Sequence, residues 1–148
     1  MNRSLKTFFS ITSVAALVLL TAVGCASTQS QAVDSTLVDS AEGSVVMTGQ
    51  FEGRNDHITT GKVSILKTST GYIARLENNF SLDGAPAPTL GFGKTGSDQA
   101  TVFTKLNNKD GYQLYAIPAT IAPASYDEFY VWCADFNVPL GVAKLNKK

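Results

Sequence analysis

The residue with the clearest capacity for chemistry in this sequence is Cys133, which ends the run YVWC near the carboxyl end. A thiol can be oxidised, can exchange with a disulfide or can bind a metal, and its reactive form is the thiolate. The nearest charged residues along the chain are Asp127, Glu128 and Asp135, all acidic. Acidic or apolar surroundings disfavour a thiolate. The local sequence by itself therefore favours a packed, inert cysteine.

Counting ligands excludes several kinds of metal and cofactor site. A blue-copper centre needs two imidazoles and a thiolate, and His57 is the only histidine. Catalytic zinc and iron–sulfur clusters lack enough ligands, and the Cys-x-x-Cys-His motif for covalent haem is absent. There is also no Gly-x-Ser-x-Gly elbow, phosphate loop or dinucleotide fingerprint. A nucleophile–base pairing of Cys133 with His57 stays open, because sequence separation neither supports nor excludes it.

The second cysteine, Cys25, closes a segment that resembles a bacterial lipoprotein signal. Arg3 and Lys6 precede an apolar stretch over 8–23, and small residues lead up to the cysteine. We therefore expect a signal peptide over 1–24 and lipidation of Cys25, which would hold the mature protein on a membrane. The residue after Cys25 is Ala26, not the Asp of lipoproteins retained at the inner membrane. By resemblance, the expected location is the bacterial cell envelope, at the outer membrane and facing the periplasm.

The remaining chain divides into a linker and one domain. Residues 25–44 carry the lipidated cysteine and a polar stretch without aromatic residues, which is typical of a flexible tether on the order of 25 Å long. The residues of 45–148 suffice for one core and contain every aromatic residue outside the signal. Without Arg3 and Lys6 the mature charge is −2, and the remaining basic residues are dispersed among acids. No nucleic-acid partner is expected.

The domain reads as all-β, an antiparallel sandwich or barrel. β-branched and aromatic residues recur at every second position, and Gly, Asn, Asp and Pro interrupt them at close intervals. We expect hairpins through 68–71 and 107–111. Alternation over 128–136 would place Phe129, Val131 and Cys133 on one face of a strand. The expected strands span 45–52, 57–66, 72–80, 88–93, 100–106, 111–117, 128–136 and 139–145.

A series of short motifs occurs in the order of one known family. The series runs from Thr48-Gly49-Gln50-Phe51, through His57-Ile58-Thr59-Thr60-Gly61-Lys62-Val63, Leu76-Glu77-Asn78-Asn79-Phe80, Asp83-Gly84-Ala85-Pro86 and Gly111-Tyr112-Gln113-Leu114-Tyr115-Ala116-Ile117-Pro118, to Val131-Trp132-Cys133, Phe136-Asn137-Val138 and Gly141-Val142-Ala143. The chain resembles the DM-thirteen domain, the electron-transfer domain of Skeletor-type proteins. The match covers about 45–145. It departs at Pro139-Leu140-Gly141, where the family has an aromatic residue before the glycine.

The resemblance implies a mostly β domain in which Cys133 is the redox residue, as a bare thiol or as a ligand to a prosthetic group such as haem. Trp132 would be the flanking indole. His57 matches the family's early histidine, as a second haem ligand or as a structural hydrogen-bonding histidine, and Met47 is a soft ligand or a core residue. A redox partner protein is implied, and we do not expect a stand-alone enzyme.

Three functions remain open from the sequence. The first is a lipid-anchored redox or electron-transfer module centred on Cys133. The second is a non-catalytic binding or adhesion module on a tether. The third is a structural envelope lipoprotein in which Cys133 only packs. The Pro-rich run 83–88 is read as a stiff loop or as a ligand-binding lip.

Overall fold

A computed structural model describes residues 43–148 of the chain. The predicted signal peptide 1–24, Cys25 and all of the predicted linker except its last two residues lie outside the described residues. Within 43–148 the regular structure consists of strands and two 3-10 turns. No helix in this part of the chain is long and apolar enough to cross a membrane.

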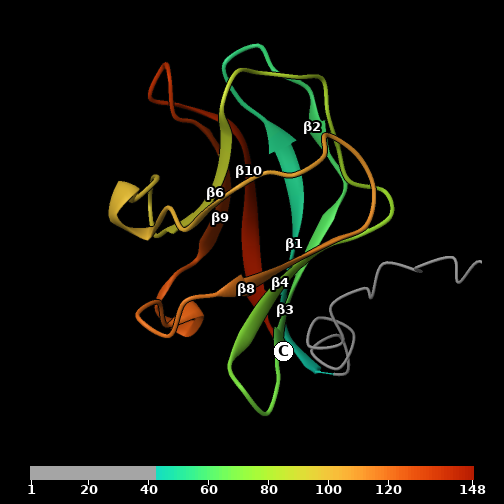
Figure 1. Cartoon of the computed structure of the whole chain (residues 1–148), viewed down its shortest axis with the longest axis vertical. Helices are drawn as coiled ribbons and strands as arrows, with labels where there is room; N and C mark the ends of the chain where they lie inside the picture. The colour runs from blue at the N-terminus through green and yellow to red at the C-terminus, as the bar shows by residue number, and fades with distance from the viewer. Residues whose placement is uncertain (1–42) are drawn as a thin grey trace, which may run out of the picture. The chain divides into compact units, whose positions relative to one another are not determined.

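Eight of the strands form one antiparallel sheet in the order β7-β6-β9-β10-β1-β3-β4-β8, and the short β2 and β5 pair separately (Figure 1). The all-β prediction is confirmed. The strands are β1 Ser44–Gly53, β2 Thr59–Thr60, β3 Lys62–Lys67, β4 Tyr72–Leu76, β5 Ser81–Leu82, β6 Pro88–Gly93, β7 Thr104–Lys105, β8 Gln113–Ile117, β9 Glu128–Cys133 and β10 Val138–Lys147.

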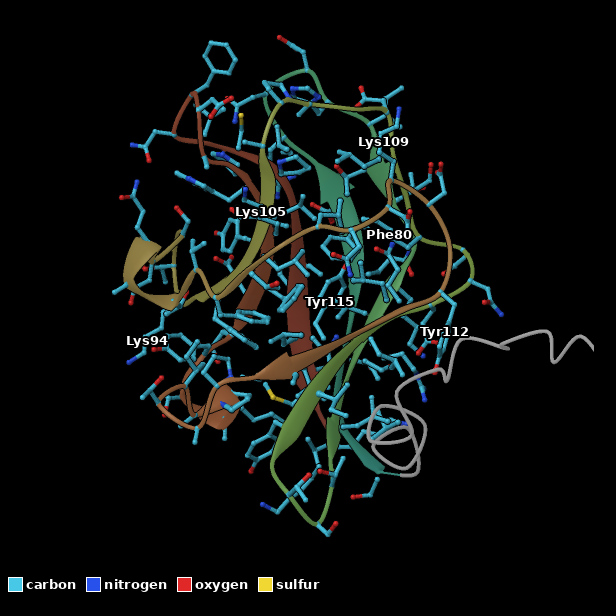
Figure 2. The ribbon with its side chains drawn as sticks, viewed as in Figure 1. Phe80, Lys94, Lys105, Lys109, Tyr112 and Tyr115 are labelled. Carbon is cyan, nitrogen blue, oxygen red and sulfur yellow. The ribbon has the colours of Figure 1, made fainter. Side chains whose placement is uncertain are left out.

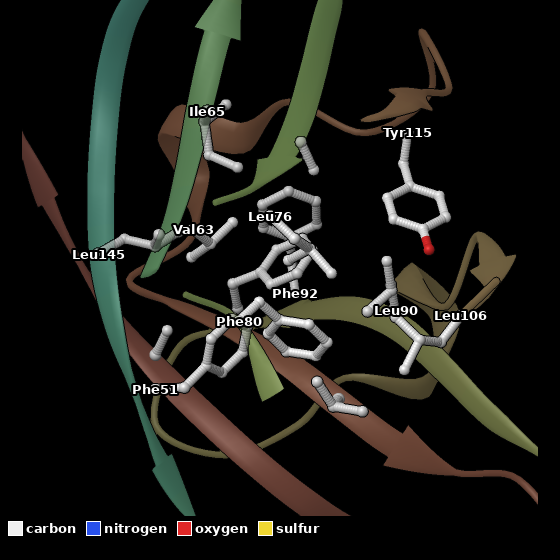
Figure 3. Close-up of a cluster of buried hydrophobic side chains, with 14 of the residues drawn as sticks. Phe51, Val63, Ile65, Leu76, Phe80, Leu90, Phe92, Leu106, Tyr115 and Leu145 are labelled. Carbon is white, nitrogen blue, oxygen red and sulfur yellow. The ribbon is translucent and has the colours of Figure 1, made fainter. Parts of the chain in front are cut away.

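Side chains bring together the two edge strands of the sheet, β7 and β8, so that it forms a nearly closed barrel. The hydroxyl of Tyr115 on β8 accepts a hydrogen bond from the Asn107 N–H (2.9 Å), just beyond β7. The same hydroxyl donates to Gln113 Oε1 at 2.5 Å. Figure 3 shows Tyr115 facing Leu90 and Leu106 across the interior. A hydrogen bond from the segment after β7 to the side chain of Tyr115, in place of a strand ladder, thus joins the two edges of the sheet.

The interior is filled by inward-facing aromatic and aliphatic residues of successive strands. Phe92 and Phe129 meet edge to face with ring centroids 5.0 Å apart, and Phe51 meets Phe80 at 5.3 Å. Val63 and Ile65 point into the same core, as alternation along β3 requires (Figure 3). Each fully buried side chain of this size contributes about 1.5–3 kcal/mol, so this core holds the sheet curved.

Two of the expected strands are interrupted in the structure. The expected strand 57–66 is divided at Gly61, whose φ is +92° and whose Cβ position would lie 2.3 Å from the carbonyl oxygen of Asn79. Only glycine fits this close approach. The expected strand 100–106 begins as a 3-10 turn, Gln99–Thr101, because Asp98 accepts a hydrogen bond from the Ala100 N–H (3.0 Å).

One of the two expected hairpins is confirmed and the other is wrong. Residues 68–71 join β3 to β4, which pair directly. Residues 107–111 do contain a glycine with positive φ, Gly111 at +82°, but the strands on either side do not pair with each other. Strand β7 pairs with β6, and β8 pairs with β4. The segment therefore crosses from one edge of the sheet to the other.

The direction of β1 defines two ends of the barrel. The strand starts at Ser44, opposite Lys67, and ends at Gly53, opposite Gly141. At about 3.3 Å per residue its ten residues span roughly 30 Å. We call the end at Ser44 the base and the end at Gly53 the distal end, which is uppermost in Figure 1.

Candidate functional site

Cys133 is the last residue of β9, a strand in the interior of the sheet. It pairs with Pro88 on β6 and with Val138 at the start of β10, so it lies at the distal end of the barrel. Its side chain belongs to the same core cluster as Phe129 and Val131, which confirms that the three share one face of the strand; the structure shows that this face points inward. Only 1% of the residue is exposed, and it is the free cysteine of the described residues.

A proline-rich segment of the chain shelters the thiol. Cys133 Sγ donates a hydrogen bond of 3.2 Å to the carbonyl oxygen of Pro86. One residue further, the Ala134 N–H donates to the carbonyl oxygen of Ala87 at 3.1 Å. Pro86 itself is exposed, while Ala85 packs against the core. The loop 83–88 therefore lies against the thiol and accepts its hydrogen bond.

The other end of this loop is fixed by Asp83. Its carboxylate accepts a hydrogen bond from the Ile58 N–H (3.0 Å) and lies 3.0 Å from His57 Nδ1, and its own N–H donates to Ile58 O at 3.0 Å. The Ile58 N–H, and then His57, hold the pKa of Asp83 below its usual value. Asp83 is thus a carboxylate that ties two loops together.

A third contact joins the loop after β1 to the start of β10. The Asn55 side-chain amide donates to Pro139 O at 2.7 Å, and the Arg54 N–H donates to Leu140 O at 3.0 Å. Hydrogen bonds therefore connect three loops at this end of the barrel, either directly or through the adjoining strand residues: 54–58, 83–88 and 134–137. We call these three loops the distal loop cluster.

Backbone strain in the described residues gathers in the distal loop cluster. The non-glycine residues with positive φ are Asn55 (+52°), Asp56 (+63°), Ala87 (+42°) and Asn137 (+58°), and all four belong to it. Asn and Asp tolerate this conformation, whereas Ala87 pays a steric cost there. Residues held in such conformations are concentrated at functional sites, where surrounding contacts enforce them. Ala87 directly follows Pro86, whose carbonyl oxygen accepts the hydrogen bond of the thiol.

The structure does not bring the other candidate ligands to the thiol. His57 is engaged with Asp83, and the one hydrogen bond of the Cys133 thiol among the described residues is to Pro86. Met47 is a buried core residue opposite Lys147, toward the base. Trp132 is buried too, but alternation along β9 turns its indole away from the face that bears the thiol.

This arrangement does not fit haem. A cysteine that ligates haem iron must be a thiolate, and there must be room for the iron next to its sulfur. Here the sulfur is buried and donates its proton to Pro86, and His57 lies in a different set of contacts. No group of three or more His, Cys, Asp or Glu residues in the described part of the chain is placed to hold a metal.

Two surface cavities lie away from the thiol. One, of about 460 Å³, is formed by Lys94 to Asp98 and Tyr126. The other, of about 260 Å³, is lined by Thr70 to Tyr72 and by residues from Ile117 to Ala122.

Tyr115 and Tyr130 do not face a common groove, since Tyr115 points inward while Tyr130 is bonded to Glu128. Burial, and then Glu128, raise the pKa of Tyr130.

Sequence reasoning identified Cys133 and the residues that share its strand face but missed its partners. The two prolines of 83–88 indicated a stiff loop, which is consistent with a fixed cover. Nothing in the local sequence indicated that the Pro86 carbonyl would accept a hydrogen bond from the thiol or that Asp83 would fix the loop. Both contacts join residues distant in sequence.

Fold and site together define a small all-β domain with one sheltered thiol at the end of a central strand. The family model described as Electron transfer DM13 matches residues 50–145, and the chain belongs to this family. Membership suggests a role in electron transfer. No curated protein and no solved structure is significantly similar to the chain.

Proposed function

We propose that this protein is a lipid-anchored, extracytoplasmic electron-transfer module whose redox group is the thiol of Cys133. The observation that carries the proposal is the placement of that thiol. It is the free cysteine of the described residues, and it lies under a loop whose two ends are fixed by separate contacts. A residue that only filled space would not require a strained cover at Ala87.

The closed arrangement protects the thiol, and reaction requires the loop 83–88 to move. Moving Pro86 breaks one hydrogen bond to the sulfur and admits water, which favours loss of the proton. The thiolate then attacks one sulfur of a partner's disulfide and forms a mixed disulfide. The partner's other sulfur leaves as a thiolate and takes up a proton, so the exchange needs no further oxidant.

The anchor and the compartment complete the proposal. Acylated Cys25 would hold the protein on the outer membrane, with the domain on a tether in the periplasm. Disulfide chemistry persists in such an oxidising compartment. The reaction partner is a protein in the same compartment, and the dispersed basic residues offer no surface for nucleic acid.

One observation favours a different function. The thiol is 1% exposed and its proton is already bonded, which also suits a binding or structural lipoprotein in which Cys133 only packs. The two functions differ in what happens to the sulfur in the cell.

The deciding experiment combines the oxidation state with a matched pair of variants. Protein purified from the envelope is titrated for free thiol, folded and denatured, beside an ultraviolet–visible spectrum and a non-reducing gel. If the redox proposal is right, a fraction of Cys133 is in a mixed disulfide. Cells that carry Cys133→Ser or Cys133→Ala should then respond to oxidants differently from cells with the unchanged protein. A fully reduced, colourless protein with a thiol that reacts only after denaturation, and silent variants of normal stability, would overturn it.

A further inference from the structure

The distal loop cluster carries two large apolar side chains that the fold leaves in solvent. Ile58 is 68% exposed in the loop 54–58, and Phe136 is 68% exposed in the turn 134–137. These are the most exposed large hydrophobic residues of the described chain, and they lie on either side of the loop that covers Cys133. Ile58 bonds to Asp83 at one end of that loop, and the turn of Phe136 begins at Ala134, which bonds to Ala87 at the other.

The cluster holds these side chains on a firm support. The hydrogen bond from Asn55 to Pro139 (2.7 Å) links the loop of Ile58 to the start of β10, directly after the turn that bears Phe136. The Asn137 side chain is also bonded to Gln99. Large apolar groups held on ordered loops lose little side-chain entropy on binding, which is a property of interface anchors.

The charge around the two apolar residues is acidic. Asp56 and Asp135 are exposed, and their carboxylates make none of the hydrogen bonds found in the described chain. Asp83 adds a third carboxylate, whose lowered pKa keeps it ionised. Of the nearby cations, Arg54 is paired with Glu52 at 3.1 Å. That leaves two lysines, Lys109 beside Gly84 and the exposed Lys105, whose neighbour Leu106 donates its N–H to Pro88 O (Figure 2), so the three carboxylates outnumber the unpaired cations. A partner that covers this surface meets apolar anchors inside an acidic rim.

We propose that the distal loop cluster is the docking surface for a partner protein with an apolar centre and a basic rim. The inference deepens the proposed redox function, because it names the kind of protein that reaches Cys133. A second copy of this chain would set acidic rims against each other, which costs affinity. An anionic bilayer would be repelled by the same charge. The tether also joins the barrel at Ser44, at the base, some 30 Å along β1 from this surface.

The first test is site-specific crosslinking in the cells that make the protein. A photoreactive benzoylphenylalanine replaces Phe136 in the full-length chain, and a matched chain carries it in place of Val102, which is 37% exposed and outside the cluster. We expect one basic protein to be crosslinked from position 136 and not from position 102. Crosslinks to lipid, to a second copy or to an acidic protein, equal capture from position 102, or no crosslink above background would each overturn the proposal.

The second test measures binding of that identified protein to purified variants. Ile58→Ser and Phe136→Ser are each expected to raise Kd about tenfold, as the loss of an interface anchor does, whereas Val102→Ser changes it less than twofold. Asp56→Asn with Asp135→Asn should weaken binding several-fold and flatten its dependence on salt. Unchanged binding in the serine variants, or affinity independent of salt, would contradict the proposal.

Repeating the binding with Cys133→Ser separates the two proposals. Docking is expected to be unchanged in this variant, since the sulfur is buried beneath the surface. If the thiol proves inert in the cell while docking persists, the redox proposal fails and the docking surface stands. If the thiol reacts but neither Ile58→Ser nor Phe136→Ser affects binding, the docking surface fails and the redox proposal stands.

Discussion

The thiol of Cys133 donates a hydrogen bond of 3.2 Å to the carbonyl oxygen of Pro86, a residue 47 positions earlier in the chain. This contact joins the end of a central strand to an exposed loop residue that is not part of a strand. Loops open at lower free energy than core strands. The reactivity of the sulfur therefore depends on the contacts that hold loop 83–88 in place.

Replacing the residue that fixes this loop should expose the thiol. In Asp83→Ala the Ile58 N–H and His57 lose their partner, so the open state becomes more populated. We expect about a tenfold faster reaction of native Cys133 with neutral iodoacetamide. Asp56→Asn is the control: it removes a neighbouring exposed charge at a φ of +63°, which asparagine tolerates, and should leave the rate unchanged. Equal rates in the two variants would show that Asp83 does not restrain the loop.

The tie between Asp83 and Ile58 should weaken only in acid. The Ile58 N–H and His57 lower the pKa of Asp83 from 3.8, so the folded state binds its proton less readily than the unfolded state. The stabilisation is complete above the unfolded value and is lost as pH falls through the lower folded value. An NMR titration of the Ile58 amide should show a midpoint below 3.8 that disappears in Asp83→Asn. A midpoint at or above the ordinary value would contradict this.

The closure of the barrel should depend on one hydroxyl. Tyr115→Phe removes the acceptor of the Asn107 N–H (2.9 Å) and the donor to Gln113 (2.5 Å). We expect a loss of about 1–3 kcal/mol in the free energy of unfolding, measured in urea, and faster hydrogen exchange at Asn107. The matched change Tyr112→Phe, at a residue 48% exposed, should alter neither. Slow exchange at Asn107 in Tyr115→Phe would mean that the edges are held by other contacts.

The strain at Ala87 should be measurable. Its φ of +42° costs an alanine about 1–2 kcal/mol, and glycine removes this cost while adding about 0.4–1 kcal/mol of unfolded-state entropy. Ala87→Gly is therefore expected to raise the free energy of unfolding by up to about 1.6 kcal/mol. Asn137→Gly, at +58°, should give a smaller gain, because asparagine tolerates this conformation. Destabilisation by Ala87→Gly would show that the loop is not strained.

Strand content followed from local pattern, whereas strand pairing did not. Alternation over 128–136 predicted that Phe129, Val131 and Cys133 share one face of a strand, and the structure places all three in the core. The expected hairpin through 107–111 was wrong, although its glycine adopts the expected positive φ. A turn fixes the local direction of the chain, but the partner of each flanking strand depends on which edge of the sheet is free.

The sequence by itself determined that the domain is all-β, that it carries one thiol in 45–148, and that this thiol shares a strand face with Phe129 and Val131. These properties depend on residue type and on a period of two, which local sequence contains. Only the tertiary structure decided that Pro86 covers the sulfur, that Asp83 binds Ile58, and that Ile58 and Phe136 remain exposed at the same end of the barrel. Such contacts join distant segments, and their positions depend on how the whole sheet curves and closes.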